Sequence, residues 1–140
     1  MKSRLPLVFT CISLCFGTAW ADVESSDFFE AKIRPVLVTH CYKCHSTESG
    51  KAKGGLRLDS RRGWEVGGDS GPAIAPGRPD RSLLLAAIDH TGATAKMPPK
   101  SRLSDQVVGD FRRWIAEGAF DPREGAAAAR EEAIDIEEGR

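Results

Sequence analysis

Apolar residues recur at helical spacing in three stretches of this 140-residue chain. In the first stretch, residues 25–39, the apolar stripe consists of Phe28, Phe29, Ile33, Val36 and Leu37. The pattern predicts a helix that is capped by Ser26 or Asp27. Pro35 removes a backbone donor and crowds the preceding turn, so we expect a kink or an early end at this residue.

The other two helical stretches lie in the second half of the chain. Residues 80–90 predict a short helix that is capped by Asp80 and buries Leu84, Leu85 and Ile88. Residues 105–117 predict a longer helix with Ser104 as N-cap, Gly118 as its stop and one apolar stripe, made of Val107, Val108, Phe111, Trp114 and Ile115. No strand pattern stands out, which favours an all-α fold with three to four short helices.

Residues 46–79 hold eight glycines and three prolines and show little periodicity, so they predict a mostly irregular segment. Irregular segments of this length are uncommon inside compact domains. This one also contains Leu56, Leu58, Trp64, Val66 and Ile74, and is therefore too apolar for a free linker. We expect it to pack against a further surface.

The N-terminus has the pattern of a signal peptide. Lys2 and Arg4 precede an apolar run that ends at Phe16, and Ala19-Trp20-Ala21 has the small-x-small form of a cleavage site. A retained membrane anchor is the alternative, but the run is shorter than the roughly 20 residues of a spanning helix. We expect residues 1–21 to be removed during export to the periplasm or an equivalent compartment, leaving no transmembrane segment.

Charge is balanced over the whole chain but not along it. The formal net charge is zero, whereas residues 121–140 contain three basic and seven acidic residues. This pattern does not indicate nucleic-acid binding. We expect a domain over residues 22–120, followed over residues 121–140 by an acidic, Ala-rich tail or linker.

The run Cys41-Tyr42-Lys43-Cys44-His45 is the attachment signature of a c-type haem. Two thiols on one helical turn reach the two vinyl groups of the porphyrin, and the adjacent imidazole then points at the iron. The alternatives are a disulfide or part of a zinc site. Structural zinc needs four protein ligands, however, and beyond this run the chain without its signal offers only His40 and His90.

Six-coordinate iron needs a second axial ligand, and Met97 is the methionine that remains after signal cleavage. A lone methionine is usually core filler, but Pro98 and Pro99 make a rigid loop that can hold its thioether against a metal. His90 is the main competitor, because bis-histidine ligation also occurs in haem proteins. His40 abuts the attachment run and is badly placed to reach the opposite face of a haem.

A bound haem also gives a short chain a surface to bury against. We expect its lining among the apolar side chains Ile74, Leu84, Phe111, Trp64 and Trp114. The indole N–H groups of the two tryptophans are candidate donors to a haem propionate, although ordinary packing is the better interpretation for each.

Residues 26–120 resemble the class I cytochrome c fold, and more closely its planctomycete-type domain. The resemblance rests on FFEAKIRPVLVTHCYKCHS, on the stretch KGGLRLDSRRGWEVGGDSGPAIAPGRPDRSLLL, on KMPP and on LSDQVVGDFRRWIAEGA. It implies helices and a Gly-rich loop wrapped around one haem c. It also implies thioether links at Cys41 and Cys44 and axial ligands at His45 and Met97.

These features predict an exported electron carrier that is not itself an enzyme. Lysines at positions 43, 51, 53, 96 and 100, together with Arg102, predict a basic rim for an acidic redox partner. Two alternatives remain open. One is a haem peroxidase or gas sensor with a displaceable sixth ligand, and the other is the haem-bearing N-terminal module of a larger redox protein.

Overall fold

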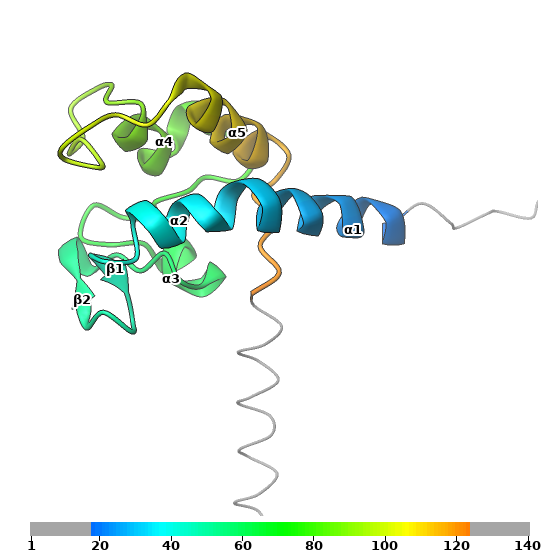
Figure 1. Cartoon of the computed structure of the whole chain (residues 1–140), viewed down its shortest axis with the longest axis horizontal. Coiled ribbons are helices and arrows are strands. Elements are labelled where there is room, and N and C mark those ends of the chain that lie inside the picture. Colours follow the sequence, from blue (N-terminus) through cyan, green and yellow to red (C-terminus); the bar gives the residue numbers. More distant parts are fainter. Residues whose placement is uncertain (1–17, 124–140) are drawn as a thin grey trace, which may run out of the picture.

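A computed structural model describes residues 18–123, which fold into a helical body with one long helical rod across it (Figure 1). The rod consists of α1 (Thr18–Phe28), a π-helical turn η1 (Phe29–Ile33) and α2 (Arg34–His40). The rod begins upstream of the predicted caps Ser26 and Asp27. Both cap predictions are therefore wrong, since the chain is already helical before these residues.

The rod does not end at Pro35, where the sequence predicted a kink or an early end. Pro35 occupies the second position of α2, directly after the wide turn η1. A proline is tolerated in the first turn of a helix, because a backbone N–H there has no intrahelical partner to lose. The π-helical turn thus lets the rod pass Pro35 and continue to the attachment run.

The Gly-rich segment contains more regular structure than predicted. A small antiparallel hairpin pairs β1 (His45–Ser46) with β2 (Lys51–Ala52), with His45 opposite Ala52. A 3₁₀ turn, η2 (Lys53–Gly55), follows, and then comes α3 (Arg61–Val66). These elements are too short to show a period in the sequence. The prediction of a mostly irregular segment without strands therefore missed them.

Two glycines in this segment are required by close backbone contact. Gly67 ends α3 at a φ of +77°, and a Cβ on it would lie 2.0 Å from the carbonyl oxygen of Gly71. A Cβ on Gly68 would lie 2.2 Å from the carbonyl oxygen of Gly54. The segment therefore folds back tightly on itself.

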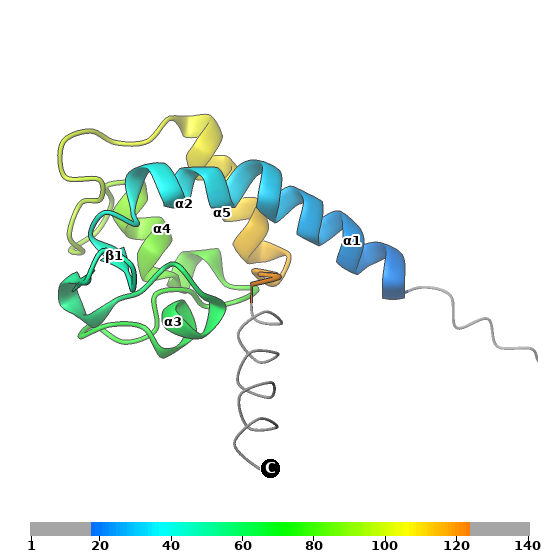
Figure 2. The same cartoon turned by 60° about the horizontal axis from the view of Figure 1, so that its bottom comes forward.

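The second half holds η3 (Pro79–Arg81), α4 (Leu83–Ile88) and α5 (Asp105–Ala116). The predicted buried face of α4 is confirmed, but Asp80 is not its cap, since α4 begins after Ser82. The prediction for α5 is confirmed at its start, where the Ser104 hydroxyl accepts a hydrogen bond from the Val107 N–H at 3.3 Å. Helix α5 lies beside the rod in Figure 1 and passes behind it in Figure 2.

An aromatic cluster fills the crossing between the rod and α5. The ring of Trp114 lies 5.7 Å from Phe29, 6.2 Å from Trp64 and 6.0 Å from Phe111, measured between ring centroids. The pairs with Trp64 and Phe111 are edge-to-face, and such pairs add stability beyond their buried area. The Trp114 indole donates to the Phe120 carbonyl at 2.8 Å, so this N–H already has a protein acceptor. Ile74 and Leu84, also expected to line a haem, are buried in the same core.

The chain after α5 returns to the core through a buried ion pair. Asp121 is only 2% exposed and accepts hydrogen bonds from the Trp64 indole at 3.0 Å and from the Arg123 Nε at 2.8 Å. Arg123 also donates to the Leu58 carbonyl at 2.9 Å and to the Tyr42 hydroxyl. The packed chain therefore extends to at least Arg123, beyond the boundary predicted at residue 120. The rest of the predicted tail lies outside the described residues.

The predicted signal segment also lies mostly outside the described residues. Its cleavage site after Ala21 falls within α1, so cleavage would leave the rod from Asp22 onward. Within residues 18–123, no helix combines the length and hydrophobicity needed to span a membrane.

The carboxyl of Asp121 predicts a specific acid sensitivity. Burial acts to raise its pKa, but the hydrogen bonds from Arg123 and Trp64 outweigh burial and hold the pKa below the usual 3.8. A depressed pKa contributes stability that is present above the usual pKa and is lost as the pH falls through the folded value. The wild-type protein should therefore lose this contribution below about pH 3.8.

We expect Asp121→Asn to lower the free energy of unfolding at pH 7 by about 3 kcal/mol, because it leaves a largely buried guanidinium without its counter-ion. Its unfolding should also depend less steeply on pH in the acid range. Urea unfolding of the haem-loaded protein from pH 2.5 to pH 7 measures both effects. Asp80→Asn, at an exposed position, is the control and should change stability by no more than about 0.5 kcal/mol. Equal stability of wild type and Asp121→Asn would contradict this role of the ion pair.

Candidate functional site: the attachment turn and the Met97 loop

The attachment run forms a tight turn at the end of α2. The Cys41 N–H donates to the Leu37 carbonyl at 2.9 Å and so continues the helix by one residue. The Cys41 carbonyl then accepts from the Cys44 N–H at 3.0 Å and from the His45 N–H at 2.9 Å. Cys41, Cys44 and His45 are thereby held within a single turn, as the spacing of the run predicted.

Cys41 and Cys44 are free thiols and form no disulfide with each other. Cys41 is 8% exposed and Cys44 is half-buried. Burial, with a smaller contribution from the neighbouring Cys44, raises the pKa of the Cys41 thiol to about 11. In the part of the chain that the structure describes, no three His, Cys, Asp or Glu side chains gather as a metal site would require. Within the described residues, the two thiols of this turn therefore lack the further ligands that a zinc site requires.

The imidazole of His45 is oriented by the Gly-rich segment. Its Nδ1 lies 3.3 Å from the Leu56 carbonyl oxygen, and the His45 carbonyl accepts from the Leu58 N–H at 2.9 Å. A proton on Nδ1 that is donated to Leu56 leaves the lone pair of Nε2 available for a metal. Histidine ligands of metals are usually held in this way by a backbone carbonyl or a carboxylate. Two free thiols and an oriented imidazole in one turn fit a covalently attached haem.

Met97 lies in the loop between α4 and α5, far from the attachment turn in sequence. Both views place this loop and the attachment turn at the same end of the molecule, on the left (Figures 1 and 2). The Met97 N–H donates to the Ala87 carbonyl at 3.0 Å, which fixes its backbone against α4. Its side chain is half-buried. The structure therefore brings the two segments to one end.

The two competing histidines lie in different surroundings. The Nε2 of His90 is 3.2 Å from the Pro98 carbonyl oxygen, so this nitrogen is engaged with the Met97 loop. His40 is exposed at the end of α2, next to Cys41. His90 is thus a neighbour of the predicted sixth ligand, a relation that the sequence did not predict.

Lysines lie close in sequence to both the attachment turn and Met97. Within residues 18–123, the side chains at positions 43, 51, 53, 96 and 100 are exposed, and none of these lysines forms an ion pair. Arg102 differs, because it pairs with both Asp89 and Asp105. Arg102 therefore adds less positive charge to the predicted rim than the five lysines do.

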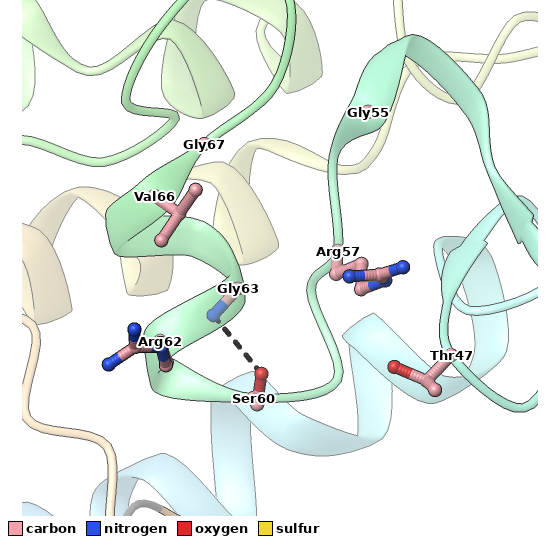
Figure 3. Close-up of a pocket in the computed structure, with 8 residues that line it drawn as sticks. All are labelled: Thr47, Gly55, Arg57, Ser60, Arg62, Gly63, Val66 and Gly67. Atoms are coloured by element: carbon pink, nitrogen blue, oxygen red, sulfur yellow. Dashed lines mark hydrogen bonds between the residues drawn. The ribbon is translucent and has the colours of Figure 1, made fainter.

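A surface pocket of about 210 Å³ lies between the hairpin and α3, and is lined by Thr47, Gly55, Arg57, Ser60, Arg62, Gly63, Val66 and Gly67 (Figure 3). Figure 3 shows the Arg57 side chain directed toward Thr47, whereas that of Arg62 points to the opposite side. The Ser60 hydroxyl in its wall accepts from the Gly63 N–H at 3.1 Å. The pocket is smaller than the roughly 300–1,000 Å³ of most cofactor sites. None of the predicted haem-binding residues lines it.

Sequence reasoning missed the residues that support the attachment turn. The Tyr42 hydroxyl between the two cysteines accepts from Arg123, which lies 81 positions later in the chain. The support for His45 comes from the Leu56 carbonyl, a backbone group that every residue type carries. No motif or period marks either contact, so only the folded chain reveals them.

Comparison with known families identifies the domain. The model of the family described as planctomycete cytochrome C matches residues 41–101. This range contains Cys41, Cys44, His45 and Met97. Comparisons with curated proteins and with solved structures gave no match. Together with the helix-rich fold and the attachment turn, the match over residues 41–101 supports a planctomycete-type cytochrome c domain.

Proposed function

We propose that this cytochrome carries single electrons through one covalently attached haem, with Cys41 and Cys44 as thioether residues and His45 and Met97 as axial ligands. The observation that carries the proposal is the attachment turn, in which two free thiols lie beside an imidazole whose Nδ1 is held by Leu56. The family match supports a c-type cytochrome and its covalent haem. The proposal goes further than the family match in two respects, namely the ligation of the iron by His45 and Met97 and the class I arrangement of the fold.

Each residue has a distinct task in this proposal. When bound, the haem supplies one-electron chemistry at its iron. The two cysteines would fix the orientation of the haem, and the Leu56 carbonyl holds the Nδ1 of His45 so that its Nε2 is free to bind the iron. The backbone contact with Ala87 holds the Met97 loop at the same end of the molecule. With both axial positions occupied, no site is open for a substrate, which favours outer-sphere electron transfer.

Export is part of the same proposal. Cytochrome c domains generally function outside the cytoplasm, and the N-terminal sequence has the features of a signal peptide. We propose cleavage after Ala21 and a domain that begins at Asp22 and extends at least to Arg123. Residues 124–140 would then form the acidic tail.

Replacing Met97 tests the sixth ligand. We expect Met97→Ala to abolish the ferric Met-to-iron charge-transfer band and to open the iron to carbon monoxide in the ferrous state. Met97→His should keep six-coordination but lower the reduction potential by on the order of 0.1 V or more, because methionine ligation raises the potential relative to bis-histidine. Visible spectroscopy and potentiometry on protein made with the c-type maturation machinery measure these effects.

Two results would contradict the proposal. A charge-transfer band that persists in Met97→Ala would exclude Met97 as ligand. Rapid binding of carbon monoxide by the wild-type ferrous protein would instead support the peroxidase or gas-sensor alternative, since it requires an open or easily displaced sixth position.

We further propose that the five exposed lysines guide an acidic redox partner to the haem end of the molecule. Lys96 precedes Met97 and Lys43 lies between the two cysteines, so an exposed positive charge lies next to the predicted ligands in both segments. Unpaired surface charges of this kind raise association rates, and their effect falls with ionic strength.

Reversing two charges on the Met97 loop tests this rim. We expect Lys96→Glu/Lys100→Glu to slow reduction by an acidic donor protein about tenfold at low ionic strength, and to match the wild-type rate near 1 M salt, where the Debye length is about 3 Å. Stopped-flow reduction at several salt concentrations measures the effect. The control is Lys32→Glu, on η1 and outside both ligand segments. An equal slowing by the control, or no salt dependence in the wild type, would contradict a rim at this end.

A further inference from the structure

The loop that carries Met97 is long and is held at few points. It runs from Asp89 to Ser104, between the end of α4 and the start of α5. At its base, the Arg102 Nε donates to the Asp89 carbonyl at 3.0 Å, and the two side chains also form an ion pair. A loop of this length has many conformations unless it is tied internally. The ties close to Met97 therefore determine where its sulfur lies.

The sequence around Met97 is poor in backbone donors. Pro98 and Pro99 have no N–H group, so these two residues cannot donate backbone hydrogen bonds that would hold the loop. The Met97 N–H is already used in the contact with Ala87. A further tie directly after Met97 can instead use the carbonyl group of Pro98 or Pro99 and a donor from another part of the chain.

His90, at the start of the loop, supplies such a donor. Its Nε2 lies 3.2 Å from the carbonyl oxygen of Pro98, the residue directly after Met97. The contacts of Ala87 with Met97 and of His90 with Pro98 thus hold the backbone on both sides of the methionine side chain. Ala87 lies in the last turn of α4, and His90 follows two residues after its end.

The backbone of His90 shows that this placement is unusual. Its φ is +58°, in the left-handed region that follows a helix C-terminus. Glycine is the common choice at this position, and histidine is, with asparagine and aspartate, one of the few other residues that adopt it more readily than most. The imidazole therefore occupies a position where glycine would cost less, and the contact that it gains is the one with the Met97 loop.

We propose that His90 is a positioning residue for Met97: by donating a hydrogen bond from Nε2 to the Pro98 carbonyl, it stabilises the loop conformation that holds the thioether on the iron. The inference rests on the proposed His/Met ligation and goes beyond it, because it assigns the competing histidine a role next to the ligand. It predicts that the bond between methionine and iron weakens when the imidazole is removed, although His90 does not touch the iron.

Competition by free imidazole measures this effect on the haem-loaded ferric protein. Imidazole displaces methionine from the iron, so its apparent affinity reports the stability of the closed loop. We expect His90→Gly to bind imidazole about fivefold more tightly, from the typical net contribution of one hydrogen bond. Glycine suits a φ of +58°, so this variant removes the side chain without adding backbone strain.

Two further variants separate the hydrogen bond from other effects. His90→Gln retains an N–H donor, and its imidazole affinity should return toward the wild-type value. Ala93→Gly, at an exposed position in the same loop, adds flexibility without removing a hydrogen bond and should raise the affinity clearly less than His90→Gly does. Circular dichroism of each variant at the temperature of the titration checks that it is folded.

The outcomes distinguish this inference from the proposed ligation. Wild-type imidazole affinity in His90→Gly would overturn the inference, and so would equal shifts in His90→Gly and His90→Gln or in His90→Gly and Ala93→Gly. Failure of the proposed ligation has a different signature. In that case the wild type would show a bis-histidine spectrum that Met97→Ala leaves intact and that His90→Gly abolishes.

Discussion

The packing of Phe29 against Trp114 is the contact on which the rest of the structure depends. Phe29 opens the π-helical turn of the rod and Trp114 lies in α5, and their ring centroids are 5.7 Å apart. The attachment turn follows the rod directly, whereas the Met97 loop leads directly into α5. The crossing of the rod and α5 thus sets the position of the attachment turn relative to the Met97 loop. These segments are distant in sequence, and the proposed function requires both at one haem.

A second layer of interactions ties this crossing to the attachment turn. Asp121 and Arg123 form a buried pair whose remaining hydrogen bonds reach Trp64, Leu58 and Tyr42. Buried ion pairs contribute little net stability unless further hydrogen bonds satisfy both ions, as they do here. The pair thereby joins the chain after α5 to the tyrosine between the two cysteines. The domain needs residues beyond α5 to complete the support of its attachment turn.

The sequence predicted several features that depend on local chemistry, although the caps at Ser26, Asp27 and Asp80 were wrong. The α5 cap at Ser104, the buried face of α4 and the single turn that holds Cys41, Cys44 and His45 all follow from residues within a few positions of one another. The family resemblance is confirmed by the match over residues 41–101. The ligand roles of His45 and Met97 remain proposals.

The features that the sequence did not reveal depend on distant or very short elements. The passage of the rod past Pro35 depends on the π-helical turn, which has no sequence signature. The hairpin at His45 is two residues long on each side, too short for alternation to be visible. The contact of His90 with Pro98 required the loop to close on α4. The first two features are too short to be recognised in the sequence, and the third is a tertiary contact.

Mass spectrometry of the chain produced with the c-type maturation machinery tests the central claim most directly. The account predicts an intact mass increased by one haem, and a proteolytic peptide containing Cys41 and Cys44 that keeps the haem after denaturation and extraction with acid acetone. Unmodified thiols in that peptide, or a disulfide between them with an extractable haem, would contradict it.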